Sequence, residues 1–202
     1  MKKLIIVVLV FAAIGFSLYK WAVGFNNTAI EKQEEAKTKW ADVESTYQRR
    51  FDLIGNLVET TKGYAAHEKE TFEAVIKARA EATKTNINVD DMTPEKMAAF
   101  QKAQSGLAGA LGKLMVVVER YPDLKADQHF KELMSQLEGT ENRINVARER
   151  YNAAVKPYNI FIRKFPNSVL AGWFGFDKMN AFASESGAEK AVKVDFSSKK
   201  QD

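Results

Sequence analysis

The chain opens with MKKLIIVVLVFAAIGFSLYKWAVGF (residues 1–25), in which two lysines precede an apolar run from Leu4 to Phe25. That run is about 22 residues long, roughly 33 Å as a helix, and this is enough to cross a bilayer. Tyr19 and Trp21 suit the aromatic belt found at membrane interfaces. We therefore expect residues 1–25 to form a transmembrane anchor.

A cleaved signal peptide is the competing interpretation of this segment. Cleavage needs small residues at a fixed spacing, and Ala22-Val23-Gly24 is the one tolerable candidate among bulky neighbours. We favour an uncleaved, single-pass membrane anchor. Lys2 and Lys3 favour a cytoplasmic N-terminus, and a long following domain crosses largely regardless of its charge, so we expect the remainder outside.

Composition excludes several classes of protein. The 202 residues contain no cysteine, which excludes disulfides, thiolate catalysis, cysteine-bound zinc and a lipidated-cysteine anchor. Only 4 prolines and 11 glycines accompany 46% hydrophobic residues, which argues against an all-β or disordered chain. The net charge of +4 arises from 30 basic and 26 acidic residues that are interspersed, so we expect no nucleic-acid partner.

The region after the anchor carries helical packing stripes. Apolar residues at spacings of three and four, such as Trp40, Tyr47, Phe51 and Ile54, predict a first helix over residues 27–85, nearly continuous with the anchor. Residues 86–92 are typical of a connector.

Two further long helices follow that connector. Thr93 and Pro94 predict the N-cap and first residue of a second helix, which carries a heptad seam and ends at Tyr121-Pro122. A third helix is expected over residues 127–164, and Phe165-Pro166 ends it.

The predicted fold class is all-α, with an N-terminal transmembrane helix followed by an elongated antiparallel bundle of three long helices plus a short C-terminal helix. With short connectors, the first and third helices would be parallel and the second antiparallel to both. We expect an anchor (1–25), a helical bundle (26–180) and a flexible polar tail (181–202).

No assembled chemistry is visible in the sequence. His67 and His129 lack the second histidine or the Glu partner that helical metal sites use, so we expect no metal and no cofactor. The apolar cluster Phe165, Leu170, Trp173, Phe174 and Phe176 either caps one end of the bundle or forms an exposed partner-binding patch, and we favour capping.

Three stretches resemble the LemA family, namely residues 40–68, 111–126 and 137–152, and the similarity extends through Phe165-Pro166 and Gly175-Phe176. One departure is Gly55, where the family usually carries proline, which puts in doubt a helix break there. The resemblance implies a bacterial membrane protein with a helical bundle and brings no catalytic residue. It suggests as structural or interaction positions Arg49, Arg50, Asp52, Asn56, Glu59, Glu119, Glu141, Asn142 and Arg148.

Polar residues on the predicted apolar seams should be paired. We predict an interhelical ion pair between Arg79 and Glu141 with Gln104 within reach, and Arg148 as the alternative partner of Glu141. Such a pair would set the register of the helices.

Taken with the absence of catalytic motifs, these features favour a membrane-anchored, non-enzymatic scaffold or interaction protein of the bacterial envelope. Membrane lipid is the expected partner of the anchor, with self-association or another envelope protein as further partners. The alternatives are a small-ligand sensor using a pocket between helices, and a regulator of a membrane peptidase.

Overall fold

The computed structural model describes residues 1–64, 68–85, 88–89 and 92–183, and all regular elements within them are helical. The predicted all-α class, with a long apolar N-terminal helix followed by a helical bundle, is confirmed. In chain order the elements are α1 (Lys2–Thr60), the short 3-10 helix η1 (Lys62–Tyr64), α2 (Lys69–Lys84), α3 (Pro94–Val118), α4 (Pro122–Ala126), α5 (Gln128–Arg163) and α6 (Asn167–Phe174).

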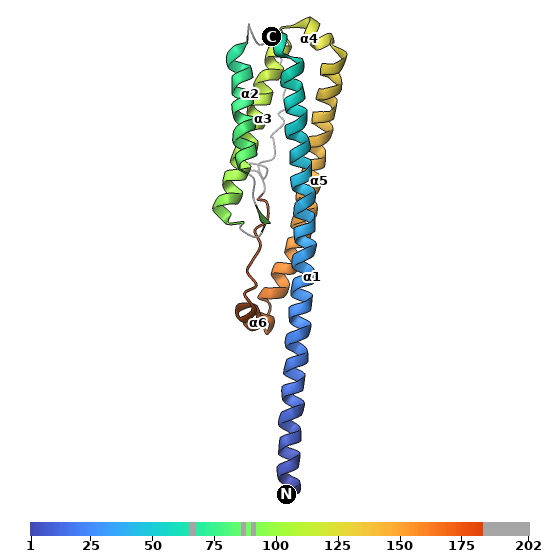
Figure 1. Cartoon of the computed structure of the whole chain (residues 1–202), viewed down its shortest axis with the longest axis vertical. Helices are drawn as coiled ribbons and strands as arrows, with labels where there is room; N and C mark the ends of the chain where they lie inside the picture. The colour runs from blue at the N-terminus through green and yellow to red at the C-terminus, as the bar shows by residue number, and fades with distance from the viewer. Residues whose placement is uncertain (65–67, 86–87, 90–91, 184–202) are drawn as a thin grey trace, which may run out of the picture.

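The longest element, α1, is one unbroken helix with an exposed N-terminal part and a C-terminal part that packs in the bundle. Its N-terminal part projects beyond the rest of the molecule (Figure 1), and the side chains from Leu4 to Leu18 are exposed and mostly apolar. This part is long and apolar enough to cross a membrane by length and composition. From Phe25 onward one face of the same helix is buried in the bundle. The predicted continuity of anchor and first helix is confirmed.

The predicted end of the first helix is wrong, because α1 stops at Thr60 rather than at residue 85. The buried hydroxyl of Thr61 donates to the carbonyls of Leu57 and Val58, at 2.7 Å and 3.2 Å, and so ties the chain back on the last turn. Two consecutive β-branched threonines followed by Gly63 also have low helix propensity. The chain turns here, and α2 forms a separate helix.

This turn reverses the expected helix directions. Trp40 of α1 contacts Tyr151 of α5, with 5.1 Å between ring centroids, while Arg50 contacts Glu141, so α1 and α5 are antiparallel rather than parallel. The hairpin of α2 and α3 packs beside them (Figure 1). In consequence α3 is antiparallel to α5, as predicted, but runs in the direction of α1.

Side-chain caps mark the starts of α3 and α5. The hydroxyl of Thr93 accepts from the amide of Lys96 at 3.2 Å, with Pro94 at the first position of α3, which confirms that helix start. The carboxylate of Asp127 accepts from the amide of Phe130 at 2.8 Å and caps α5.

The apolar cluster after α5 divides into two sets of side chains. Leu170 is buried and Phe176 packs edge-on against Phe25, so these residues cap the bundle as predicted. Phe165 and Trp173, in contrast, are 84% and 80% exposed. The helix α6 lies beside α1 at the end of the bundle from which the free N-terminal part extends (Figure 1).

Candidate functional site

A repeated pair of residues on α5 binds the segment that follows α6. Residues 177–183, here called the C-terminal segment, have no regular secondary structure and run along α5 (Figure 1). The phenol of Tyr158 donates to the carbonyl of Asp177 at 2.9 Å, and seven residues earlier the phenol of Tyr151 donates to the carbonyl of Asn180 at 2.8 Å. Each tyrosine is followed by an asparagine that also contacts this segment.

The two asparagines clamp the backbone at both its donor and its acceptor. The amide of Asn159 donates to the carbonyl of Met179 at 2.8 Å and accepts from its N–H at 2.9 Å. The amide of Asn152 does the same with Phe182, at 3.1 Å and 2.9 Å. A primary amide presents the same donor and acceptor as a peptide group. Each asparagine therefore forms with this segment the two hydrogen bonds that a neighbouring β-strand would otherwise form.

The spacing of these clamps follows from the geometry of the two elements. Seven residues of α-helix rise roughly 10.5 Å, and three residues of extended chain span roughly 10 Å. Asn152 and Asn159 are seven apart, whereas their partners Phe182 and Met179 are three apart and run in the opposite direction. The sequence Tyr-Asn at 151–152 and again at 158–159 is the signal that could have revealed this site, but these four residues are not among the positions predicted from the sequence.

Beyond these clamps, the side chain of Phe182 completes the aromatic core. Its ring lies 5.7 Å from Trp40 and 5.8 Å from Tyr151, and it is 6% exposed. The guanidinium of Arg148 covers the other side of this ring, 4.8 Å from its centroid. The predicted start of a flexible tail at residue 181 is therefore wrong for residues 181–183, while residues 184–202 lie outside the described residues.

Burial also changes the ionisation of the two phenols that hold the C-terminal segment. Burial raises the pKa of Tyr151 well above its usual range. Burial also raises the pKa of Tyr158, with the nearby carboxylate of Asp177 adding to the effect and Lys37 opposing it. Both phenols are therefore neutral donors over the physiological pH range.

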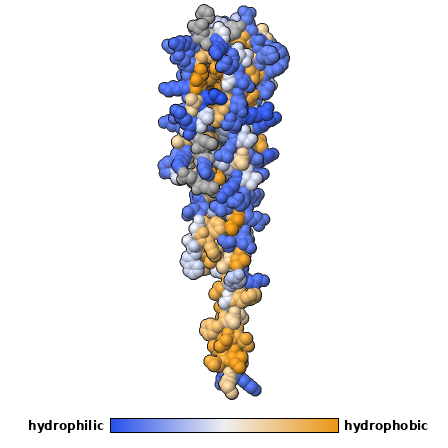
Figure 2. Space-filling view, in the orientation of Figure 1, coloured by the Kyte–Doolittle hydropathy of each residue, from blue (hydrophilic) through white to orange (hydrophobic). Residues whose placement is uncertain are grey.

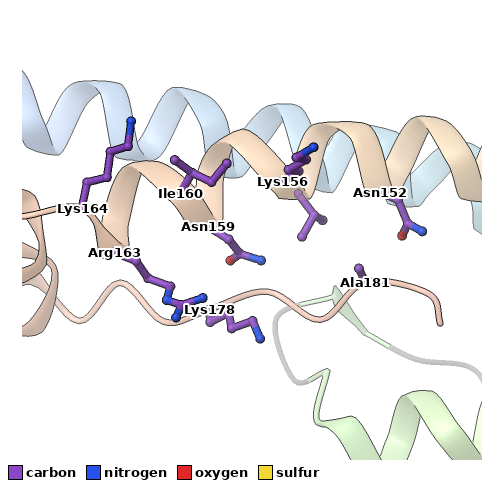
Figure 3. Close-up of a pocket in the computed structure, with 9 residues that line it drawn as sticks. Asn152, Lys156, Asn159, Ile160, Arg163, Lys164, Lys178 and Ala181 are labelled. Atoms are coloured by element: carbon purple, nitrogen blue, oxygen red, sulfur yellow. The ribbon is translucent and has the colours of Figure 1, made fainter.

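A groove of about 530 Å³ lies between α5 and the C-terminal segment. Figure 3 shows Asn152 and Asn159 pointing from α5 toward that segment, and Arg163 and Lys178 extending into one end of the groove. Its lining includes four cationic residues and no acidic one. We call it the basic groove, and its cations are Lys156, Arg163, Lys164 and Lys178.

Of the residues predicted to meet across helices, only Glu141 is in an interhelical ion pair, and its partner differs from the prediction. Its carboxylate lies 3.2 Å from the guanidinium of Arg50, whose side chain is 7% exposed. The predicted pair with Arg79 is wrong, because Nε of Arg79 donates to the carbonyl of Phe51 at 2.8 Å. Arg148 does not replace it either, since it contacts Phe182.

The cause of this error is the missed turn after Thr60. With α2 folded back, the guanidinium of Arg79 lies over Gly55, where an added Cβ would be 3.3 Å from its Nη2. The helix α1 continues through Gly55, so no break occurs where the family usually has proline. Gln104 is buried, and neither polar atom of its side chain has a hydrogen-bond partner among the described residues.

The remaining predicted positions do not converge on one site. Asp52 accepts from Gln48 one turn earlier, Glu59 pairs with Lys62, and Glu119 pairs with Lys125. The other members of the set are exposed on α1 and α5, namely Arg49, Asn56 and Asn142. His129 is exposed and His67 lies outside the described residues, among which no group of three metal-binding side chains occurs.

Comparison with known proteins gives a consistent result. A model described as the LemA family matches residues 39–196. Two proteins named magnetosome protein MamQ, from Paramagnetospirillum magneticum, are each 31% identical over 185 residues, which cover 82% of this chain and 67% of theirs. A protein named LemA from Metamycoplasma hominis is 24% identical over 149 residues, covering 74% of this chain and 64% of its own.

Proposed function

Because this chain belongs to the LemA family, whose model covers most of its length, we propose that it is a membrane-anchored, non-enzymatic scaffold or interaction protein of the bacterial envelope. The observation that carries the proposal is the uninterrupted helix α1, of which one part has the properties of a membrane span and the other is a core helix of the bundle. A bundle built on such a helix is held at the membrane surface in a defined direction.

The distribution of polar residues supports a structural role over a catalytic one. Covalent and acid–base catalysis by side chains depends on reactive groups that are held within hydrogen-bond distance of one another. The candidate residues instead form separate contacts along the bundle, and the buried polar side chains of Arg50 and Thr61 serve helix pairing and a turn.

In orientation, we propose that the N-terminus is cytoplasmic and the bundle lies outside the inner membrane. Protease added to intact spheroplasts should then digest the bundle, whereas full protection would reverse this orientation. N-terminal sequencing of protein from the membrane fraction should find Met1 to Phe25 retained. A mature start near Phe25 would show instead that the segment is a cleaved signal.

The interaction role is tested by cross-linking in native membranes. Anchored helices meet neighbours at a high effective concentration, so we expect adducts of defined mass, to a second copy or to another envelope protein. A photo-reactive residue at the exposed position Arg49 would capture proteins that contact α1, and one at the exposed position Asn142 would capture proteins that contact α5. A protein that stays monomeric and without adducts at both positions would contradict the interaction role.

A small-ligand sensor is the second candidate, because the basic groove has a volume within the range of ligand sites. Calorimetric titration of the full chain with small anions would detect binding of such a ligand. Because the groove is open to solvent, its walls would have to move together to surround the ligand completely.

A further inference from the structure

The outward face of α6 is apolar and exposed. Phe165 lies in the turn just before the helix, and Val169 and Trp173 follow four residues apart on one side of it. Their exposed fractions are 84%, 48% and 80%, and Phe174 beside them is 48% exposed. We call this set the α6 face. Large aromatic side chains gathered at this exposure mark a contact with another apolar phase.

The opposite side of α6 sets its distance from the membrane. Leu170 and Ala171 are buried in one cluster with Phe25, and the half-exposed ring of Phe174, at the edge of the α6 face, lies 6.2 Å from that of Phe25. Trp21 packs against the same cluster, four residues or roughly 6 Å nearer the N-terminus. Because the apolar part of α1 ends at these residues, α6 lies where the bilayer surface would meet the helix.

The shape of the surface agrees with this position. Figure 2 shows apolar residues gathered along the free part of α1, with further apolar surface next to it at the lower end of the bundle, where Figure 1 places α6. The rest of the visible bundle surface is mainly hydrophilic. The apolar surface of the span is thus continued sideways by the α6 face.

Charge adds a second observation that is independent of hydropathy. Arg163 and Lys164 directly precede α6 in the chain, and Lys178 follows it. All three line the basic groove with Lys156, and none of the four forms an ion pair with the described residues. Unpaired cations beside an apolar face suit the phosphates of anionic lipids.

We propose that α6 is a second membrane contact, which docks the α6 face into the interface of an anionic bilayer while the cations of the basic groove face the lipid headgroups. Tryptophan prefers the headgroup level because its ring is apolar and its N–H is polar, and phenylalanine adds apolar area to the buried face of interfacial helices. This inference rests on the membrane anchor of the proposed function, and it adds a site that fixes the bundle against the surface.

The test uses the natural absence of cysteine, since each introduced thiol is then the only one in the chain. Trp173→Cys reports on the α6 face, Phe11→Cys on the span, and Val116→Cys is the control, because Val116 is also apolar and 69% exposed but lies on α3. Each variant of the full chain carries a polarity-sensitive fluorophore in nanodiscs of phosphatidylcholine, alone or mixed with phosphatidylglycerol. A lipid spin-labelled near its headgroup serves as the quencher.

With mixed lipid we expect a blue-shifted, quenched signal at positions 11 and 173 and an unquenched one at position 116. Removing charge by Arg163→Gln and Lys164→Gln should lower the ratio of docked to undocked α6 about fivefold per charge in mixed lipid and leave it unchanged in phosphatidylcholine. Lys131→Gln on the opposite end of α5 is the matched control and should change nothing.

The outcomes that would overturn the inference are distinct. An unquenched signal at position 173 with a quenched one at position 11 refutes docking and leaves the anchor intact. Unquenched signals at both positions refute the anchor itself. Disulfide-linked dimers of unlabelled Trp173→Cys protein under mild oxidation, together with an unquenched signal from the labelled protein, would assign the α6 face to a second copy. Quenching at position 173 that is the same in both lipids and unchanged by the glutamine variants would refute the role of the cations.

Discussion

Replacing Asn152 by Ala should release the C-terminal segment by an amount that can be worked out from two hydrogen bonds. The side chain donates to the carbonyl of Phe182 at 3.1 Å and accepts from its N–H at 2.9 Å. Each such bond contributes about 1 kcal/mol net, so their loss costs about 2 kcal/mol. Alanine has the higher helix propensity and returns about 0.5 kcal/mol, which leaves a net loss of about 1.5 kcal/mol.

Native-state hydrogen exchange with mass spectrometry measures this loss where it occurs. A change of about 1.4 kcal/mol alters an opening equilibrium tenfold, so amides of residues 177–183 should exchange roughly tenfold faster in the variant. Asn142→Ala is the matched control, because Asn142 is exposed on the same helix and forms no side-chain hydrogen bond with the described residues. Equal exchange in the two variants would show that the amide clamps do not hold this segment, and the geometric argument would fail.

Four further substitutions test the packing of the bundle. Gln104→Met keeps the shape of a buried side chain whose amide has no partner among the described residues, so the free energy of unfolding should rise by about 1–3 kcal/mol in urea titrations; a loss of stability would mean that the amide is bonded. Glu141→Gln removes the charge opposite the buried Arg50 and should lower the free energy of unfolding by about 1–2 kcal/mol, given that Glu141 is half exposed. Arg50→Met should lower it less, because it leaves no buried charge. The reverse order of the two losses would contradict this reasoning. Because burial raises the pKa of Tyr151 in the folded state above its ordinary value of 10.0, stability should be complete below about pH 10 and fall as the pH rises further; Tyr151→Phe should flatten that alkaline slope, and an unchanged slope would assign it to other groups.

The predictions that succeeded are those that depend on periodic patterns. The apolar run from Leu4, the stripe through Trp40 and Tyr47, and the Thr93-Pro94 start signal each determine local structure through neighbouring residues. Such patterns survive into the fold because hydrophobic burial and helix capping act over one or two turns.

The turn after Thr60 could not be found in this way. No proline marks it, and the apolar stripe continues through Phe72 and Val75 on the far side, so the pattern matches one helix as well as two. What decides between them is the tertiary packing of α2 on α3, which a single sequence does not display. Every error in helix direction, and the wrong partner for Glu141, follows from that one turn.

The C-terminal segment escaped prediction for a different reason. Its backbone bonds go to side chains of α5, not to a strand or to itself, so it has neither helical nor strand periodicity. Only Phe182, a single aromatic residue between two alanines, hinted at burial. The residues that determine the position of this segment are the two Tyr-Asn pairs of α5.

Because α1 is continuous, any tilt of the proposed membrane span is transmitted to the bundle. From Phe25 to Thr60 the helix rises roughly 52 Å, since each residue adds about 1.5 Å. Membrane helices commonly lean by about 20°, and a change of that size would carry the far end of the bundle sideways by roughly 18 Å. A change in the tilt of the proposed span is thereby amplified into the position of the α1–α2 turn, and the proposed docking of α6 would limit that change.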